Sequence, residues 1–556
     1  MNWETLRKNT SALSLLAMLV ILLTLLSKPY LATNVPLISD EFTEIHLGAR
    51  ISRGELPYSA AWTYEKTPGL SFYLALPPIL FSDGPSIVLL ARLSMLPIAL
   101  LLLIAVWKTA LELRGRDAAF FALIFLCCCT TFIDRSFRMR TDLVSTTFWA
   151  WALYFLLAKG KKWSFLKASI LLACGFLFTQ KAVYFAFAGF LLCFLKSECS
   201  KKRALAEFAT GMTITFALYL LFFTLCGLGW QCIAINFRAA KVGVSQFYSN
   251  YKYSMTEFLR SPAFWLAALL GLFSEWKRKA RSLGLIIVSV LLFALTLNHG
   301  SKWPYYYLKL LPTCALLASF LFADLLVLLK SKLGPQKGEY IALLAVVLLF
   351  ICPALWRFKT YWHGQALMDY QLATITWVEE TTEPDDAFFD GVGTVPTRPR
   401  SYRDLFVRDL IAYGQGLLPD LIEILKRNEC KVHILNYRSN NLPQKEKNWL
   451  NEHFVHDWGN IFVAGAEIVL RDKSVAEKFE LHCSGNFLLE HSVRNASIIV
   501  DGQNYQSGKN LKLDKGIHVA KSDRKGRIKL RYRALGKKAP QYRPRAITRI
   551  YARYED

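Results

Sequence analysis

Charge is scarce in this sequence, and acidic charge is the scarcest. Charged residues make up 20% of the 556 residues, with 42 Asp+Glu against 67 Lys+Arg, whereas soluble globular proteins carry about 25% charged residues. The shortage is uneven, because residues 1–356 hold long apolar runs and only 17 acidic residues, while residues 357–556 hold 25. This distribution excludes a simple soluble enzyme, a disordered chain and a secreted disulfide-rich miniprotein.

Several familiar patterns are also missing. The 12 cysteines form no CxxC pair and no Cys/His metal spacing, and most lie in apolar runs, so we interpret them as small buried side chains. Walker loops, GxGxxG turns and nucleophile elbows are absent. The sequence therefore predicts no metal site and no organic cofactor, and it leaves open whether a divalent cation takes part.

The apolar runs predict a polytopic α-helical membrane domain over residues 1–356. A straight span needs about 20 residues, and several of the candidate spans are shorter: 11–27, 88–110, 117–132, 142–158, 165–180, 182–196, 205–227, 262–276, 282–298, 304–329 and 339–356. Clusters of Lys and Arg follow alternate spans, which is typical of cytoplasmic loops. We therefore expect a cytoplasmic N-terminus and an outward-facing C-terminal region, and we expect no nucleic-acid partner.

The C-terminal 200 residues predict a soluble region of two parts. Residues 357–474 alternate apolar strands with helical stretches, which is typical of an α/β domain. Residues 475–556 contain short strands broken by Gly and Asn, which suggests a small β-sandwich, and they end in a basic tail able to contact anionic membrane lipids. Within this part, Asp501-Gly502 is typical of a hairpin turn.

Acidic residues of the membrane domain gather in two short segments. One is the loop after the first span, residues 28–87, and the other precedes the fourth span and ends at Asp142. Ionisable groups near the bilayer edge are costly and usually line a polar cavity. A carboxylate placed there can act as a general base on a hydroxyl, and neighbouring Arg and Lys can neutralise a phosphate as it leaves.

Four segments, in this order along the chain, resemble the GT-C superfamily of glycosyltransferases: residues 38–76, 138–156, 175–192 and 298–319. The first carries Asp40-Glu41 and Glu65-Lys66-Thr67-Pro68, and the second carries an Arg-x-Asp start at Arg140. Protein O-mannosyltransferases, the lipid A aminoarabinose transferase and rhizobial lipopolysaccharide core transferases belong to this superfamily. Thr67 and Gly69 depart from the Pro-Pro-Leu of many relatives, which leaves the sugar open.

The resemblance implies a GT-C-like fold and a bacterial inner-membrane enzyme. Such an enzyme moves a sugar from a polyprenyl-phosphate-linked donor to a lipid, glycan or protein acceptor on the outer face. Carried over residue by residue, the resemblance implies Asp40 as the catalytic base and Asp142 as a second carboxylate facing the same cavity. It implies substrate-binding roles, mostly around the donor, for Glu41, Glu65, Lys66, Arg138 and Arg140.

Each of these residues also has a purely structural interpretation. Asp40 and Glu41 can cap a helix beginning near Phe42, and Asp142 can be an ordinary acid at a helix N-terminus. The pair Glu65-Lys66 can be a surface ion pair, and the two arginines, like Lys181, can anchor the chain at the membrane interface. We interpret the aromatic cluster Trp303 and Tyr305–Tyr307 as a membrane-interface belt.

Two other function classes compete with a donor-dependent glycosyltransferase. The first is a non-enzymatic polytopic protein, either a lipid or sugar transporter or an accessory subunit of envelope assembly. Transporters favour inverted repeats and helices broken at mid-membrane, and the sequence contains no internal repeat. The second is a lipid-linked polysaccharide ligase, whose large outer loop would come late in the chain instead of after the first span.

The distribution of Lys and Arg makes a testable prediction about topology. Reporter fusions at Pro335 and Lys509 should report opposite sides of the membrane, because Pro335 lies in a basic loop and Lys509 in the outward region. Alkaline phosphatase and green fluorescent protein activities measure the two sides independently. Both fusions on one side would contradict the arrangement of eleven spans.

Overall fold

The computed structural model describes residues 11–59, 67–158, 162–195, 200–238, 251–278, 283–298, 303–361, 365–471, 475–493, 496–538, 544 and 550–551. Within these residues the chain forms two compact units, each built from separate stretches of sequence. The first unit comprises residues 1–35, 56–73 and 91–363, and the second comprises residues 36–55, 74–90 and 364–556. The loop after the first span thus contributes to both units.

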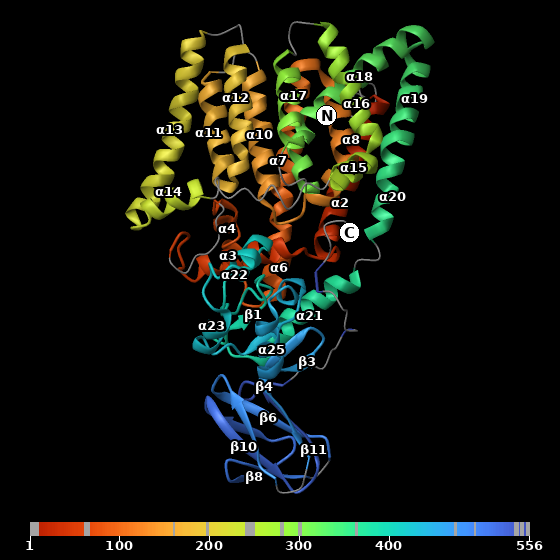
Figure 1. Cartoon of the computed structure of the whole chain (residues 1–556). Helices are drawn as coiled ribbons and strands as arrows, with labels where there is room; N and C mark the ends of the chain where they lie inside the picture. The colour runs from red at the N-terminus through yellow and green to blue at the C-terminus, as the bar shows by residue number, and fades with distance from the viewer. Residues whose placement is uncertain are drawn as a thin grey trace. The chain divides into compact units, whose positions relative to one another are not determined.

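The first unit is a bundle of helices whose long members run roughly side by side (Figure 1). Within the described residues, each of the eleven apolar ranges coincides with one helix or with two or three consecutive helical segments. The helices are α2 (Ala12–Asn34), α4 (Gly69–Tyr73), α7 (Met95–Arg114), α8 (Arg116–Cys128), α9 (Thr130–Arg135), α10 (Thr141–Leu157), α11 (Ser164–Phe178), α12 (Val183–Leu195), α13 (Lys201–Leu225), α14 (Gly229–Arg238), α15 (Tyr251–Arg260), α16 (Pro262–Arg278), α17 (Leu283–Leu297), α18 (Leu311–Leu333), α19 (Pro335–Val346) and α20 (Cys352–Thr360). Short 3-10 helices η1 (Gln180–Ala182) and η3 (Pro304–Leu310) precede α12 and α18, and a π-helical turn η4 (Val347–Ile351) joins α19 to α20.

This bundle is that of a multi-pass membrane protein. Among the described residues, five helical segments are both long and apolar enough to cross a membrane: Ala12–Asn34, Gly84–Arg114, Lys201–Leu225, Pro304–Leu333 and Pro335–Thr360. Five shorter apolar helical segments accompany them. Close approach between helices requires small residues: a Cβ on Gly271 of α16 would lie 2.1 Å from the carbonyl oxygen of Leu317 in α18. Helix pairs in membranes commonly meet at such positions, because lipid supplies no hydrophobic drive between them.

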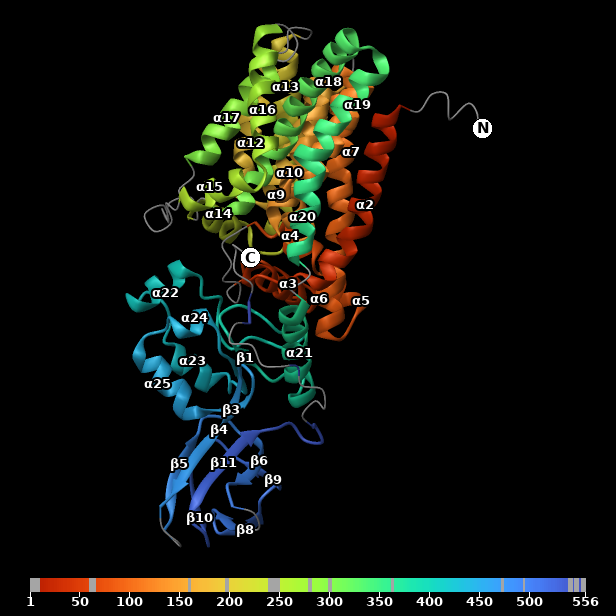
Figure 2. The ribbon, with the colours of Figure 1, turned by 90° about the vertical axis from the view of Figure 1, so that its right-hand side faces the viewer.

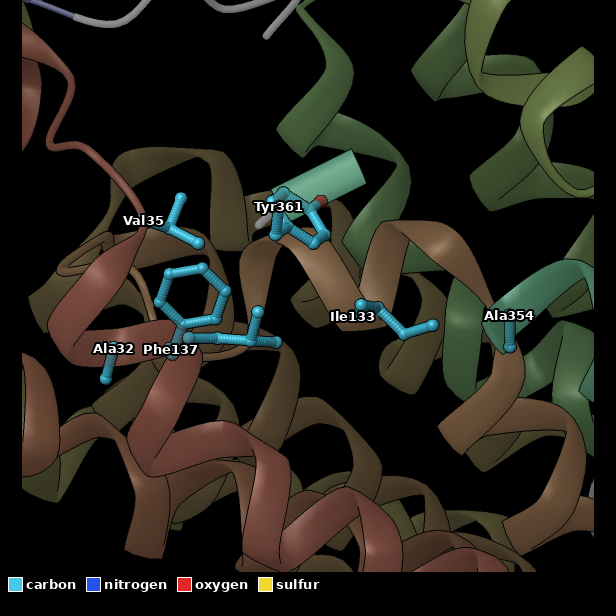
Figure 3. Close-up of a cluster of buried hydrophobic side chains, with 7 residues drawn as sticks. Ala32, Val35, Ile133, Phe137, Ala354 and Tyr361 are labelled. Carbon is cyan, nitrogen blue, oxygen red and sulfur yellow. The ribbon is translucent and has the colours of Figure 1, made fainter. Parts of the chain in front are cut away.

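A polar contact inside the bundle ties α2 to the segment that precedes α10. The ammonium of Lys28 donates to the carbonyl oxygens of Phe132 (3.1 Å) and Ile133 (2.9 Å). A buried apolar cluster surrounds this junction and joins α2, α9 and α20 (Figure 3): Leu31, Ala32, Val35, Ile133, Phe137, Ala354 and Tyr361. Because an unpaired charge inside a membrane is costly, Lys28 holds the end of α9 firmly in place.

The second unit contains the α/β and β-rich parts predicted for the C-terminal region. Its helices are α3 (Ser39–Ser52), α5 (Leu76–Leu80), most of α6 (Gly84–Leu93), α21 (Gln365–Thr381), α22 (Val407–Gly414), α23 (Leu421–Arg427), α24 (Tyr437–Asn440) and α25 (Gln444–His453). Its strands are β1 (Phe388–Phe389), β2 (Val432–Ile434), β3 (Phe454–Trp458), β4 (Ile461–Leu470), β5 (Glu477–Leu481), β6 (Gly485–His491), β7 (Ser497–Val500), β8 (Gln503–Gln506), β9 (Asn510–Leu513), β10 (Gly516–Ser522) and β11 (Gly526–Tyr532).

Two sheets organise these strands. A seven-stranded sheet has the order β1-β2-β4-β11-β6-β9, with β3 also paired to β4, and a four-stranded sheet has the order β5-β10-β7-β8. Strand β4 is ten residues long and continues from the α/β part into the β-rich part, so one sheet serves both (Figure 2). The hairpin at Asp501-Gly502 is confirmed: β7 pairs antiparallel with β8, and both turn residues have positive φ, 49° and 83°.

A buried histidine makes the stability of this unit depend on pH. His433 on β2 is 4% exposed and stacks on Phe389, with 5.6 Å between ring centroids. Burial lowers the pKa of His433 to about 4 from an ordinary value of 6.5. Below pH 6.5 the unfolded chain therefore binds a proton at His433, whereas the folded chain does not until the pH nears 4. The free energy of unfolding falls as the pH drops from 6.5 to 4.

We expect the sheet around β2 to lose about 2 kcal/mol of stability between pH 7 and pH 5 through His433 alone. The His433→Phe variant removes the titrating group and keeps an aromatic ring, so it should lose correspondingly less. Hydrogen exchange of a β2 peptide, corrected for intrinsic rates and referenced to a peptide of α18, measures the difference. Equal acid sensitivity in both proteins would contradict this account.

Candidate active site

Asp40 lies in the first turn of α3, beside a buried arginine. Its carboxylate is 3.9 Å from the guanidinium of Arg438 in α24, and the two side chains are 12% and 3% exposed. Burial opposes the charge on Arg438, but the neighbouring Tyr437 and Asp40 outweigh it and raise the pKa of Arg438 above its ordinary value. Arg438 therefore places a positive charge beside the carboxylate of Asp40.

Arg438 is held in place by contacts on both sides. It donates to the carbonyl oxygen of Gly391 (2.6 Å) and to the hydroxyl of Tyr437 (3.1 Å). That hydroxyl is hydrogen-bonded in turn to Ser39, the residue before Asp40, at 2.9 Å. Arg438 was not among the predicted site residues, because Ser39 and Tyr437 are 398 positions apart and no local pattern links them. Its only signal in the sequence was an Arg two positions after Asn436, close behind an apolar strand.

The loop that presents Gly391 is itself organised by one carboxylate. Asp390 accepts hydrogen bonds from the backbone N–H groups of Val392 (2.8 Å), Gly393 (2.8 Å) and Thr394 (2.9 Å). Gly391 and Gly393 have φ of 68° and 99°, and a Cβ on Gly393 would lie 2.8 Å from the Cβ of His46 in α3. Glycine is therefore required where the loop meets α3.

Glu41 is fully buried and caps the helix that carries Asp40. Its carboxylate accepts the backbone N–H of Ile38 at 3.2 Å, and its own N–H donates to the carbonyl oxygen of Ile38 at 3.0 Å. This is the reciprocal contact by which a Glu in the first turn satisfies an otherwise unpaired N–H at the helix start. The capping interpretation therefore has a concrete contact, and the helix begins at Ser39, not near Phe42. A substrate-binding role for Glu41 stays a prediction.

The first unit holds the second predicted carboxylate, Asp142. It lies in the first turn of α10 and is 1% exposed. One carboxylate oxygen is 3.5 Å from a guanidinium nitrogen of Arg140, and the other has no hydrogen-bond partner among the residues that the structure describes. Arg140 in turn stacks on Tyr305 of η3, with 3.4 Å from Cζ to the ring centroid. The structure thus brings Arg140 and Asp142 together.

Two lysines complete a group of cations and tyrosines around η3, in which Lys181 and Tyr184 are half-buried. Lys181 donates to the hydroxyl of Tyr306 at 2.6 Å. Lys309 is 1% exposed, its ammonium lies 4.7 Å from the Tyr306 ring centroid and 5.1 Å from that of Tyr184, and it has no hydrogen-bond partner among the described residues. We call this group the η3 cluster: Arg140, Asp142, Lys181, Tyr184, Tyr305, Tyr306 and Lys309.

The η3 cluster shows that the predicted membrane-interface belt was wrong for its tyrosines, and it adds Lys309 to the candidate site residues. Tyr305, Tyr306 and Tyr307 are 5%, 4% and 1% exposed, so they do not form a membrane-interface belt, whose rings would face lipid headgroups. Arg140 and Lys181 lie against the ring of Tyr305, Lys181 and Lys309 lie against the ring of Tyr306, and Tyr307 packs edge-on against Phe258. Lys309 was not among the predicted site residues, although a lone Lys within the apolar run 308–317 was a usable signal.

Arg138 lies two residues before Arg140. It is 2% exposed, and its Nε donates to the backbone carbonyl oxygen of Asp134 at 3.1 Å. Asp134 also accepts from Arg357 at 2.9 Å, so this stretch contributes to the junction between α9 and α20. Glu65 and Lys66 lie outside the described residues. Within the part of the chain that the structure describes, no three His, Cys, Asp or Glu side chains are grouped as metal ligands.

Comparison with known proteins bears on the fold. A family model described as dolichyl-phosphate-mannose-protein mannosyltransferase matches residues 65–226. ArnT from Cupriavidus metallidurans in the apo state superposes with a TM-score of 0.59 and 14% identity, covering 82% of this chain and 98% of ArnT. ArnT bound to undecaprenyl phosphate gives 0.56 and 13% over the same shares. The chain has the GT-C fold.

The resemblance to the GT-C superfamily is thereby confirmed at the level of the fold. An oligosaccharyltransferase from Archaeoglobus fulgidus, tethered with an acceptor peptide, matches more loosely, with a TM-score of 0.49 and 10% identity over 76% of this chain and 69% of that one. No curated protein sequence matches the chain. The GT-C likeness therefore rests on shared helix arrangement at low sequence identity.

The contact between Glu41 and Ile38 leads to a prediction about stability. Glu41→Ala should destabilise α3 by about 1 kcal/mol, because an N–H at the helix start loses its acceptor. Glu41→Gln should recover most of this loss, since the amide oxygen can accept the same hydrogen bond. Thermal unfolding of the detergent-solubilised protein measures both. An unchanged midpoint for Glu41→Ala would contradict the capping role.

Proposed function

We propose that this protein is an integral membrane glycosyltransferase that uses a polyprenyl-phosphate-linked sugar. The observation that carries the proposal is the superposition on ArnT bound to undecaprenyl phosphate, which extends over 98% of that protein. The match of residues 65–226 to a family of dolichyl-phosphate-mannose-dependent transferases supports the same donor class. The acceptor is a lipid, glycan or protein on the outer face of a bacterial inner membrane, with the N-terminus in the cytoplasm.

Asp40 acts as the general base in this proposal. It removes the proton of the acceptor hydroxyl as the oxygen attacks the anomeric carbon of the donor sugar. The bond from that carbon to the phosphate oxygen breaks, and the polyprenyl phosphate leaves as an anion. Arg438 lies 3.9 Å from this carboxylate and offsets its negative charge. Asp142 serves as a second carboxylate of the same reaction.

The η3 cluster holds the donor phosphate. Lys309 has a buried ammonium without a hydrogen-bond partner among the described residues, an arrangement that costs free energy unless an anionic ligand completes it. Arg140 and Lys181 add two further positive charges. Cations aimed at a leaving phosphate stabilise the transition state more than the ground state, because the negative charge grows as the bond breaks. Glu65, Lys66 and Arg138 contribute to donor binding in this proposal on the sequence resemblance alone.

The base assignment predicts the effect of one substitution. Asp40→Asn keeps the shape of the side chain and removes its proton-accepting charge, so turnover should fall by about 100- to 10,000-fold. Membrane insertion and donor binding should stay near normal. Transfer from a radiolabelled polyprenyl-phosphate sugar measures turnover, and Asp83→Asn, an exposed acid in the same loop, is the matched control. Retention of more than about half of the wild-type turnover would exclude Asp40 as the base.

Lys309 offers a second test, because its substitution should raise stability and lower turnover if Lys309 binds the donor phosphate. Lys309→Met removes a buried charge and should raise the unfolding temperature. If Lys309 holds the donor phosphate, the same variant should lose about 10- to 100-fold in turnover, the value of one charge-assisted hydrogen bond. Lys330→Met, near the end of α18, is the control. A more stable Lys309→Met protein with full activity would remove Lys309 from the donor site.

A further inference from the structure

The outer face of the seven-stranded sheet carries a polar cavity that the proposed reaction does not use. Its volume is about 530 Å³, within the range of small-ligand sites. Three adjacent strands form its floor: Arg531 of β11 lies opposite Leu488 of β6, which lies opposite Asn510 of β9. Glu490 and Arg533, two residues along their chains from Leu488 and Arg531, belong to the same face.

A buried carboxylate organises the cationic side of this cavity. Asp457 accepts from Arg531 at 2.9 Å, from Arg533 at 3.0 Å and from the indole of Trp377 at 2.7 Å. Arg531 also pairs with Glu490. The guanidinium planes are therefore fixed before any ligand arrives, which lowers the entropic cost of binding.

The ion pairs with Asp457 and Glu490 do not engage every nitrogen of the two guanidinium groups. Arg533 is 5% exposed and its Nη1 has no hydrogen-bond partner among the described residues, and the same holds for Nε of Arg531. Lys537 and Lys538 line the cavity as well, so four positive groups face two carboxylates, Asp457 and Glu490. The excess of two positive charges suits an anionic ligand.

The remaining lining indicates what kind of anion. Asn510 provides both a donor and an acceptor, Glu490 provides an acceptor, and Leu488 provides an apolar patch among them. A ring with several hydroxyls needs donors and acceptors on all sides and an apolar surface for its C–H face, whereas a bare phosphate needs donors alone. A mixed lining with excess positive charge therefore favours a sugar that carries a negative group.

We propose that this cavity binds an acidic saccharide, a sugar unit bearing a carboxylate or a phosphate. Arg533, Arg531 and the two lysines hold the anionic group, while Asn510 and Glu490 bind hydroxyls. The site is a binding site and not a catalytic one, and it gives the β-rich part a function of its own in holding glycan. It does not depend on the identity of the catalytic base or on the donor.

The test compares matched ligands on the full-length protein in detergent. Saturation-transfer NMR with glucuronate, glucose 6-phosphate and glucose measures whether the negative group matters on a constant ring. We expect both acidic sugars to bind at least tenfold more tightly than glucose. Equal affinity of glucose and the acidic sugars would overturn the proposal, and so would inorganic phosphate binding as tightly as glucose 6-phosphate, since a simple anion site would then suffice.

Variants locate the binding. The double variant Lys537→Gln/Lys538→Gln alters exposed side chains only and should raise the dissociation constant for glucuronate about tenfold, with an unchanged unfolding temperature. Lys478→Gln/Lys521→Gln, on β5 and β10 of the other sheet, removes the same charge and should leave affinity unchanged. Equal losses in both double variants would overturn the proposal. Binding of anionic phospholipid vesicles, lost in the first variant while no sugar binds, would assign the face to a membrane surface instead.

Discussion

Charge that is buried away from water must be compensated, and much of this structure depends on how that is done. Lys28 donates to two backbone carbonyl oxygens at the end of α9. Arg140 and Lys181 lie against tyrosine rings, and Arg438 lies between Gly391, Tyr437 and Asp40. The contacts of Lys28, Arg140 and Lys181, and those of Arg438 with Gly391 and Asp40, join segments that are separated in sequence, because the few acidic residues cannot pair locally with every cation.

In the η3 cluster, buried charge is not fully compensated by the described residues, and this points to a functional role for the cluster. A structural ion pair would leave no buried ammonium without a hydrogen bond, since such a group destabilises the folded protein. Lys309 has none among the described residues, and one oxygen of Asp142 has none either. Proteins keep such costs mainly where a ligand or a reaction requires them. The proposed donor phosphate would offset the cost at Lys309.

The C-terminal region contributes directly to the helix that carries Asp40. Residues 36–55 belong to the same compact unit as residues 364–556, and Arg438 and the loop after Asp390 contact α3. A soluble tail is thus part of the environment of the proposed base, in addition to holding a cavity of its own on the sheet. The apolar runs extend over residues 1–356, but the compact units do not follow that boundary, because residues 36–55 and 74–90 belong to the unit that contains the C-terminal region.

The sequence by itself determined the helices of the bundle, the strands of the β-rich part and the Asp501-Gly502 turn. Those features follow from apolar run length, alternation and turn chemistry, all of which act over a few residues. The GT-C fold was accessible too, through short motifs such as Asp40-Glu41 and the Arg-x-Asp at Arg140. Tertiary structure alone decided that Glu41 is fully buried, that Tyr305 lies under Arg140, and that Arg438 stands beside Asp40. The physical reason is distance along the chain: a buried charge selects its partner by position in space, and no local pattern records that choice.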